Sequence, residues 1–421
     1  MRKVNAVKAL FVCTDDFPHN GACTSLLLNL FIQGDLLESV EHLAVLTVKH
    51  EFSKNSYEEY EQIQINRFLD WRFITMNKLK KLFFKQPLQA IKGFSNKLFN
   101  YIYARILPKR FLQKNTVAAF EMALQKIKAE EFDVIIAVAG NFNVVEAVRI
   151  FVNKNPNVKF IIYQVDPCAS NEIFDRRTYN DRIRFEKNAY VVADHVLTTK
   201  IICDEVDLRY DGVFSSKFHA VEFPNVSQKT IMVPENDRQE VIKCIFAGSL
   251  SLAIRNPEYT YRLFVCQDAQ QVRFDLIGVA VDELPVKYRN GCINCFGRLS
   301  LDDAREKMSE ADVLVNIGNS MTNQVPSKLF EYISYGKPIV NICKNRNCPT
   351  LPYLDKYPYV LNLFEEDNLF DEQVEKLHAF IATNGKKRIP SQKILSMYET
   401  CTPEYCATQM LEVFEKCIKK S

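Results

Sequence analysis

The sequence predicts an α/β protein with two doubly wound, Rossmann-like domains, each built on a parallel sheet. Short apolar runs that read as buried strands alternate with helical patterns over residues 8–199 and again over residues 241–343. Between the two series, residues 223–240 lack periodicity and contain the polar stretch Pro234–Arg238, which is typical of an interdomain linker. A chain of 421 residues is also too long for one core, so two domains of roughly 200 residues are expected.

Bulk composition is that of a globular protein and excludes several classes of function. The 54 Lys and Arg residues nearly balance the 51 Asp and Glu residues, so no global charge requires nucleic acid as a partner. No run approaches the ~18 apolar residues of a transmembrane helix, and the apolar run Ala9–Cys13 is too short for a signal peptide. The thirteen cysteines lie mostly in strand-like runs, which favours free thiols in a reducing cytosol. We therefore expect a cytoplasmic protein.

The first domain is expected to open with a strand at Lys8–Cys13, a loop at Thr14–Ala22 and a helix at Ser25–Gln33. This is the opening of a Rossmann unit, although the loop has only Gly21 and lacks the Gly-x-Gly-x-x-Gly fingerprint of dinucleotide binding. Further strands are expected at Leu43–Val48, Asp133–Ala139, Lys159–Tyr163 and His195–Thr199, and helices at Val117–Ala129 and Val144–Asn153.

Asp166 directly follows the expected strand Phe160–Val165 and precedes Pro167. It is therefore placed at the carboxyl end of a parallel strand, where open α/β sheets keep their sites. An aspartate before a proline is also a common turn former, so the residues alone leave a local role open.

The second domain is expected to begin with the strand Val241–Gly248, which ends in a glycine where backbone can approach a phosphate. Arg255 follows in the next loop, ahead of a helix. Later elements are expected at Val272–Gly278, Cys292–Ser300 and Pro403–Lys419. Cys292 and Cys295 have the spacing of metal ligands, but no second pair with a nearby His follows, so we expect no metal site.

The strongest local pattern is Pro326-Ser-Lys-Leu-Phe-Glu-Tyr-Ile-Ser-Tyr-Gly-Lys-Pro-Ile-Val340. Ser327 is a good N-cap, Gly336 can take the left-handed conformation that ends a helix, and Pro338 blocks its continuation. The pattern therefore predicts one short helix with both ends marked.

Apolar runs at residues 312–317 and 339–343 flank this helix and read as buried strands, so the helix is the crossover of a βαβ unit. Side chains three or four apart share a helix face, which places the cation Lys328 beside the carboxylate Glu331. The loop before such a helix is a common ligand site, because its free N–H groups attract phosphate.

Over residues 242–343 this arrangement resembles the nucleotide-sugar site of GT-B glycosyltransferases, especially the large retaining family numbered four. The resemblance implies two Rossmann-like domains that face each other across a cleft, with the acceptor on the N-terminal side. It places the domains at residues 1–222 and 241–400, the linker at 223–240, and a helix within 401–421 that crosses back to the first domain.

The function implied is transfer of a sugar from a nucleotide-sugar donor to a glycan or lipid-linked acceptor in cell-surface polysaccharide biosynthesis. By the same resemblance the reaction proceeds with retention. No clear Asp-x-Asp follows an apolar strand, as the metal-dependent alternative fold would need, so we expect transfer without a metal and without a cofactor other than the donor. Cations and a helix start would supply the positive field that a leaving diphosphate needs.

The resemblance also assigns roles to individual residues. Glu331 would bind the ribose of the donor, and Lys328 and Arg255 would neutralise the leaving diphosphate. Asp166 would face the reactive carbon of the donor. The remaining donor-side residues would be Gly21, Gly248, Arg298, Leu299, Asn323 and Ser327.

Asn323 is a departure from the family pattern. The family has a second glutamate eight residues before the ribose-binding one, and this sequence has Asn323 there. The sugar-ring contact and the stereochemical outcome are therefore open.

Residues 67–114 hold twelve Lys or Arg residues and a single acid, Asp70, with ten aromatic residues interleaved. This composition is typical of helices in an anionic lipid interface. The segment is expected to be an insertion, at about residues 67–115, in the acceptor-binding domain. A lipid-linked acceptor on the cytoplasmic leaflet would explain both features. The alternative is a helical pair that packs its aromatics on the sheet, and nucleic acid lacks support from the fold.

Two other functions share the predicted architecture. Nucleotide-sugar 2-epimerases have two Rossmann domains but need several acid and base side chains, and none of the six histidines lies in a convincing loop. A catalytically silent GT-B subunit is favoured by Asn323 and by the single glycine of the first loop.

Overall fold

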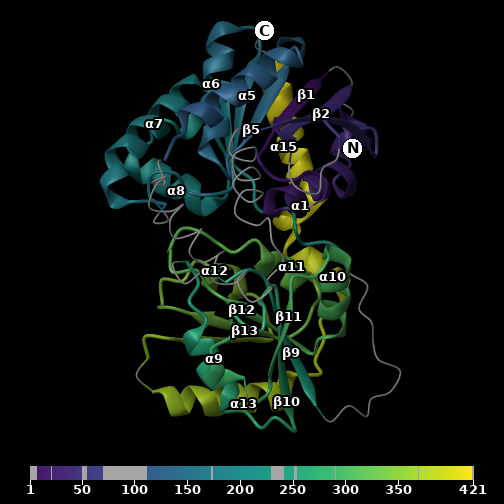
Figure 1. Cartoon of the computed structure of the whole chain (residues 1–421), viewed down its shortest axis with the longest axis vertical. Helices are drawn as coiled ribbons and strands as arrows, with labels where there is room; N and C mark the ends of the chain where they lie inside the picture. The colour runs from purple at the N-terminus through teal and green to yellow at the C-terminus, as the bar shows by residue number, and fades with distance from the viewer. Residues whose placement is uncertain are drawn as a thin grey trace, which may run out of the picture. The chain divides into compact units, whose positions relative to one another are not determined.

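The computed structural model describes residues 7–19, 21–49, 55–69, 111–171, 174–228, 241–250, 254–289, 291–367 and 369–419 (Figure 1). The chain divides into two compact units, one of residues 1–222 and 406–421 and one of residues 223–405. Each unit contains one predominantly parallel sheet, as the sequence predicts. None of the described helices is long and apolar enough to cross a bilayer.

Within the described residues, the N-terminal unit holds an eight-stranded sheet of order β3-β4-β2-β1-β5-β6-β7-β8. The strands are β1 (Lys8–Val12), β2 (His42–Val48), β3 (Tyr57–Tyr60), β4 (Ile63–Phe68), β5 (Val134–Val138), β6 (Lys159–Gln164), β7 (His195–Thr198) and β8 (Phe218–Ala220). All neighbours pair in parallel except β3 and β4. Both faces of β1 and β5 are buried, which explains why these strands are continuous apolar runs.

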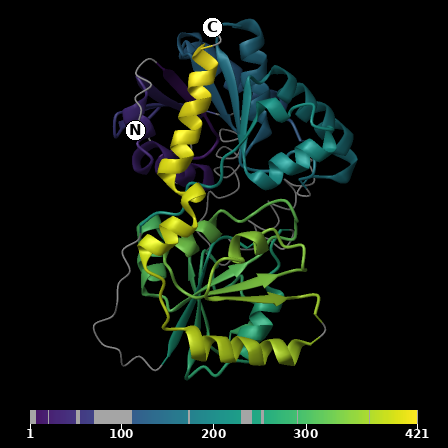
Figure 2. The ribbon, with the colours of Figure 1, turned by 180° about the vertical axis from the view of Figure 1, so that it is seen from behind.

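Helices of this unit are α1 (Ala22–Leu28), α2 (Leu36–Ser39), α5 (Lys114–Lys126), α6 (Phe142–Lys154), α7 (Tyr179–Val192) and α8 (Lys200–Arg209). Apolar side chains of α5, α6 and α7 form one core with the sheet. The last helix, α15, spans Pro403–Lys419, and its residues from 406 onward group with the N-terminal unit, along which Figure 2 shows them running.

The basic insertion expected at residues 67–114 lies mostly outside the described residues. Its described ends are packed into the N-terminal unit. Arg67 is the penultimate residue of β4, its side chain is fully buried, and it pairs with Glu58 at 2.7 Å. Phe68 packs edge-on against Phe120, and Phe111 lies in the core. Arg67 is therefore a structural residue, and its inclusion in a lipid-facing basic surface was wrong.

The neighbouring strands β7 and β8 carry a histidine pair whose titration gives one prediction. His219 Nε2 lies 3.0 Å from His195 Nδ1. Burial, His195 and Lys416 lower the pKa of His219 from 6.5 to about 4. Between these two values the unfolded chain binds a proton that the folded chain does not. The stability that neutral His219 contributes is therefore fully present above pH 6.5 and is lost as the pH falls towards 4.

We expect a His219→Gln variant to lose less thermal stability than the wild type between pH 6.5 and pH 4, because this titration is removed. Melting temperatures measured at half-unit pH steps test the prediction. Parallel curves for the two proteins would contradict it.

In the described part of the C-terminal unit, six parallel strands are arranged in the order β11-β10-β9-β12-β13-β14. They are β9 (Ile242–Ala247), β10 (Val272–Ile277), β11 (Ile293–Gly297), β12 (Val313–Ile317), β13 (Ile339–Cys343) and β14 (Val360–Phe364). The helices are α9 (Glu258–Val265), α10 (Leu301–Glu310), α11 (Lys328–Ser334), α12 (Leu351–Leu354), α13 (Phe370–Asn384) and α14 (Ser391–Met397). Counted from β9, this is the strand order 3-2-1-4-5-6 of a Rossmann fold.

The carboxyl ends of β9 and β10 approach each other so closely that only glycine fits. Gly278 has a φ of +94°, and its N–H donates to Gly297 O at 2.7 Å. A Cβ at this position would collide with Gly248 O. Gly297 also has a positive φ, +66°, but a Cβ there would meet no atom within 4 Å.

This difference gives a matched pair of variants. Gly278→Ala is expected to cost about 2–4 kcal/mol, because the left-handed backbone and the collision both oppose the side chain. Gly297→Ala should cost only the backbone contribution of about 1–2 kcal/mol. Urea unfolding measures both losses, and equal losses would show that the contact between Gly278 and Gly248 is not tight.

Candidate functional site

The topological switch point of the C-terminal sheet lies between β9 and β12, where the strand order reverses. Ligands of open α/β sheets bind outside the carboxyl ends of strands at such a point. The loops that follow β9 and β12 are tied together there, because the backbone N–H and the hydroxyl of Ser320 both donate to Ile254 O, at 2.7 and 3.0 Å.

Arg255 lies at this switch point, and its side chain is half-buried. Its Nη2 donates to Asn319 Oδ1 at 2.8 Å, and its Nη1 is 3.6 Å from the position of a Cβ on Gly248. Burial lowers the pKa of Arg255, and its Nε is buried without a hydrogen-bond partner. No carboxylate of the described residues forms an ion pair with it. The structure thus brings Arg255 and Gly248 together, and the described part of the chain supplies no counter-ion for this cation.

Asn319 was missed by the sequence analysis. It is the second residue after β12, is 6% exposed, and its Nδ2 donates to Gln324 O at 3.0 Å. The amide therefore connects Arg255 to the loop that leads into α11. Asn323, the predicted sugar-ring residue, lies half-buried in the same loop.

Glu331 sits on α11 between two cations. Lys328 Nζ is 2.6 Å from its Oε2, so the predicted pair at the helix start is present. Arg305 of α10 places its Nε 3.8 Å from Oε1, a partner that the sequence analysis did not find because it comes from another helix. Glu331 is only 8% exposed, so the two cations hold a nearly buried carboxylate.

Tyr332 fixes α11 to the end of β9. Its hydroxyl accepts a hydrogen bond from Ala247 N at 2.7 Å and donates to Ala247 O at 3.2 Å. Ala247 is the residue before Gly248, so this contact sets the distance between α11 and the switch point.

Part of the segment expected as a linker also holds α11. Asn225 Nδ2 donates to Ser327 O at 3.1 Å, and the hydroxyl of Ser334 joins Asn225 O to Ser227 N, at 2.9 and 3.1 Å. The rings of Phe223 and Phe330 lie 5.4 Å apart. Residues 223–228 are therefore packed onto this helix, and residues 229–240 lie outside the described residues.

Ser327 does not cap α11 as the sequence suggests. Its backbone is already helical, with φ −57° and ψ −25°, and its hydroxyl makes no capping hydrogen bond. The reason is that the turn starts one residue earlier, since Leu329 N donates to Pro326 O at 3.0 Å. At the other end, Gly336 has the expected left-handed φ of +61°.

Arg298 and Leu299 lie in the loop between β11 and α10, where Arg298 is exposed and Leu299 half-buried. Within the described residues, no hydrogen bond or ion pair joins them to Arg255 or Glu331. Their assignment to the base and the phosphates stays a prediction.

The first loop of the N-terminal unit is filled by its own aspartate. Asp15 Oδ2 accepts hydrogen bonds from Cys23 N at 2.8 Å and Thr24 N at 3.3 Å, at the start of α1. Gly21 has a φ of +128°, and a Cβ there would collide with the Asp15 carboxylate. The chain itself therefore requires glycine at this position, and an approach of ligand to Gly21 stays a prediction.

Asp166 follows β6 as predicted and is half-buried. Burial raises the pKa of the Cys23 thiol, and the nearby charges of Asp15 and Asp166 add to the rise. A Cβ on Gly140, beyond β5, would lie 2.9 Å from Cys23 Sγ. Asp166 is thus near the switch point between β1 and β5 in its own sheet.

A buried carboxylate anchors the loop that begins at Asp166. Glu186 of α7 accepts hydrogen bonds from Ala169 N at 2.8 Å and from Arg209 Nη1 at 2.6 Å. Arg182 donates from the same helix to Ala169 O at 3.0 Å. Both backbone groups of Ala169 are therefore held by charged side chains.

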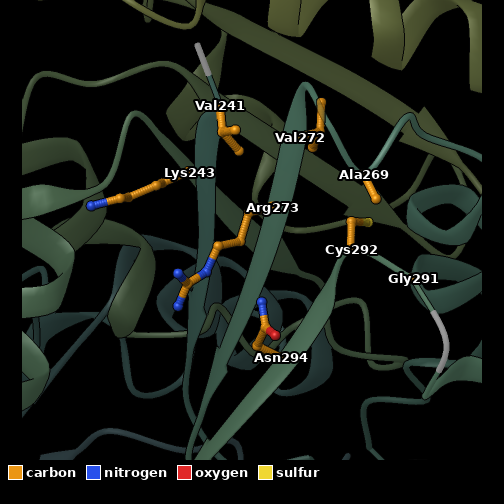
Figure 3. Close-up of a pocket in the computed structure, with 8 residues that line it drawn as sticks. All are labelled: Val241, Lys243, Ala269, Val272, Arg273, Gly291, Cys292 and Asn294. Carbon is orange, nitrogen blue, oxygen red and sulfur yellow. The ribbon is translucent and has the colours of Figure 1, made fainter. Parts of the chain in front are cut away.

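A pocket of about 470 Å³ lies at the opposite, amino ends of β9, β10 and β11 (Figure 3). The polar side chains that line it are Lys243, Arg273 and Asn294. Arg273 Nε already pairs with Asp275 at 2.7 Å, and Asn294 donates to the same oxygen at 3.1 Å. Lys243 Nζ lies 4.0 Å from Glu310 Oε2. Both cations that line this pocket therefore have a carboxylate partner, whereas Arg255 has none among the described residues.

No protein-family model and no curated protein matches the sequence. Solved structures match it over nearly the whole chain. An α,α-trehalose-phosphate synthase (UDP-forming) from Burkholderia vietnamiensis has a TM-score of 0.65 and 10% identity, with 99% of both chains covered. The apo form of the lipopolysaccharide outer core galactosyltransferase WaaB has a TM-score of 0.56 and 14% identity, with 97% of this chain and 99% of that chain covered.

A putative UDP-N-acetylglucosamine 2-epimerase from Listeria monocytogenes also matches, with a TM-score of 0.54, 9% identity, and 99% of this chain and 98% of that chain covered. At such low identities the likeness concerns the fold. The predicted fold class, with two Rossmann-like units as in GT-B proteins, is confirmed. Because transferases and an epimerase share it, the fold alone does not decide the reaction.

Proposed function

We propose that the protein is a glycosyltransferase whose C-terminal unit binds a nucleotide-sugar donor. The observation that supports this best is Arg255, a half-buried cation with a shielded Nε and no carboxylate partner among the described residues, at the switch point of a Rossmann sheet. Burying an unpaired charge is costly, so such a site is suited to an anionic ligand. The diphosphate of a nucleotide sugar is an anion of the required kind.

The donor contacts follow from the arrangement around α11. Glu331 accepts hydrogen bonds from the ribose hydroxyls, and Lys328 turns from Glu331 to the diphosphate. The Ser327 hydroxyl and the backbone at Gly248 complete the phosphate site, while Arg298 and Leu299 lie by the base. Cations that stabilise the leaving diphosphate lower the barrier to transfer. The proposal needs no metal and no cofactor other than the donor.

The acceptor is assigned to the N-terminal unit, with Gly21 and Asp166 on the side of the transferred sugar. Retention of configuration is proposed, with Asn323 as a neutral contact to the sugar ring. The anomeric configuration of the product, followed by NMR during the first turnovers, tests this point, and an inverted product would rule it out.

A nucleotide-sugar panel tests the reaction itself. Incubation with UDP-, GDP- and ADP-sugars should release the nucleoside diphosphate slowly, by transfer to water, and faster once an acceptor is present. Interconversion of the sugar without release would instead indicate the epimerase, the second candidate, which shares the fold. Binding without either change would indicate a silent subunit.

The acceptor is proposed to be a glycan or lipid-linked sugar of cell-surface polysaccharide synthesis, reached at the inner face of the cytoplasmic membrane. The support is the composition of residues 67–114, since basic and aromatic residues together favour anionic lipid. Without the buried Arg67, eleven basic residues remain in this segment.

Liposome flotation tests the membrane proposal. The wild type should float with anionic vesicles at low salt and be released as salt rises, because the attraction is screened. A variant with Lys78, Lys80, Lys81 and Lys85 changed to Glu should stay in the dense fraction. A wild type that also stays there at low salt would favour a soluble glycan acceptor.

A further inference from the structure

The side-chain partner of Arg255 among the described residues is a neutral amide and not a carboxylate. Asn319 Oδ1 is 2.8 Å from Arg255 Nη2, and an aspartate has nearly the same shape as an asparagine. The other amide group, Nδ2, donates to Gln324 O at 3.0 Å, so the orientation of the side chain is fixed from both ends. Asn319 therefore holds Arg255 in place without cancelling its charge.

An amide and a carboxylate at position 319 differ in what they offer to the two neighbours. A carboxylate would form an ion pair with the guanidinium of Arg255, but it would lose the hydrogen bond to Gln324 O and place an oxygen against that carbonyl. The same pair would compete with any anionic ligand of Arg255. The amide therefore satisfies both neighbours and leaves the positive charge of Arg255 available to an anion.

We propose that Asn319 is a positioning residue that keeps the charge of Arg255 directed at the phosphates of a bound nucleoside diphosphate. This inference rests on the proposed function and adds the reason why the phosphate site is active: its cation is held by a neutral group. The specificity is for the diphosphate, and the nucleoside part is bound elsewhere in the site.

The test is the substitution Asn319→Asp in the full-length protein, with UDP, GDP and inorganic pyrophosphate as probes and uridine and guanosine for comparison. Calorimetry should show diphosphate and pyrophosphate affinity lowered roughly tenfold to a hundredfold, the range of one charge-assisted hydrogen bond. Nucleoside affinity should stay the same. The melting temperature of the ligand-free variant measures the change in stability separately, because the gained ion pair with Arg255 and the lost hydrogen bond to Gln324 O oppose each other.

A purely structural role for Asn319 would raise or lower the melting temperature without this selective loss for phosphates. Asn256→Asp is the matched control, because it adds a carboxylate next to Arg255 in the sequence at an exposed position whose side chain accepts from Glu258 N. Its diphosphate affinity should change by less than about threefold, as expected of a screened surface charge.

If Asn319→Asp does not fold, the substitution Asn319→Ala is used in its place. It removes the hydrogen bond that holds Arg255, so it should still weaken diphosphate binding severalfold. Wild-type diphosphate affinity in whichever variant folds would overturn the inference. A wild type that binds none of the probes would instead refute the proposed donor site, so the two failures are distinguishable.

Discussion

A Glu186→Gln variant is expected to lose about 3–5 kcal/mol of folding free energy, the usual cost of breaking a buried ion pair. Glu186 is 1% exposed, and its carboxylate receives hydrogen bonds from Ala169 N, Arg209 Nη1 and, at 3.0 Å, Tyr210 OH. Glutamine keeps the shape but removes the charge, so Arg209 loses its buried counter-ion. The new NH₂ group of glutamine is a donor, and it would face another donor where the carboxylate oxygen now accepts a hydrogen bond.

The chain offers a matched control in Glu205→Gln. Glu205 pairs with the same Arg209, but its side chain is 23% exposed, and the loss should stay below about 1 kcal/mol. Urea unfolding followed by circular dichroism measures both variants. Losses of equal size would mean that the burial of Glu186 does not determine the strength of its pairing.

The Glu186→Gln variant should also affect catalysis selectively. Ala169, which Glu186 holds, lies three residues after Asp166 in the same loop. If the proposed function holds, a looser loop is expected to lower the rate of sugar transfer, while nucleotide affinity stays near the wild-type value because the proposed donor contacts belong to the other unit. An equal loss of transfer rate and of nucleotide affinity would contradict the separate roles proposed for the two units.

Most of the strands that the sequence predicts are buried on both faces. β5 is fully buried and reads as an uninterrupted apolar run, so it is recognisable without any tertiary information. β3 was missed, because its sequence Tyr-Glu-Glu-Tyr belongs to a partly exposed strand at the edge of the sheet. Edge strands have solvent on one side and lack the apolar run.

The helix α11 and its left-handed end at Gly336 were predictable because their signals are local. The supporting contacts were not. Asn319 and Arg305 meet their partners only after the chain has folded, and no periodicity links them to Arg255 or Glu331. The same reason explains the packing of residues 223–228 on α11, since an aperiodic polar segment carries no sign of what it will contact.

Substitutions of Lys328 and Glu331 are expected to have the second large effect, which is on the affinity for nucleotides. Lys328→Ala is expected to weaken binding of a nucleoside diphosphate by about 1–3 kcal/mol, since one charge-assisted hydrogen bond to phosphate is lost. Nucleoside binding should change little. Glu331→Ala should weaken both ligands by a similar amount, because the ribose is common to them.

Two readouts separate these roles. Titration calorimetry with UDP, GDP and their 2′,3′-dideoxy forms measures the ribose contribution, which should disappear in Glu331→Ala and persist in Lys328→Ala. Arg305, 3.8 Å from Glu331, still orients the carboxylate when Lys328 is absent.

The matched controls are Lys376→Ala and Glu372→Ala, which break a surface pair one helical turn apart on α13. These variants keep the same change in net charge but lie on a helix outside the switch point, so their nucleotide affinity should equal that of the wild type. If Lys328→Ala and Glu331→Ala bind all four nucleotides as tightly as these controls do, α11 is an ordinary crossover helix and the donor site lies elsewhere.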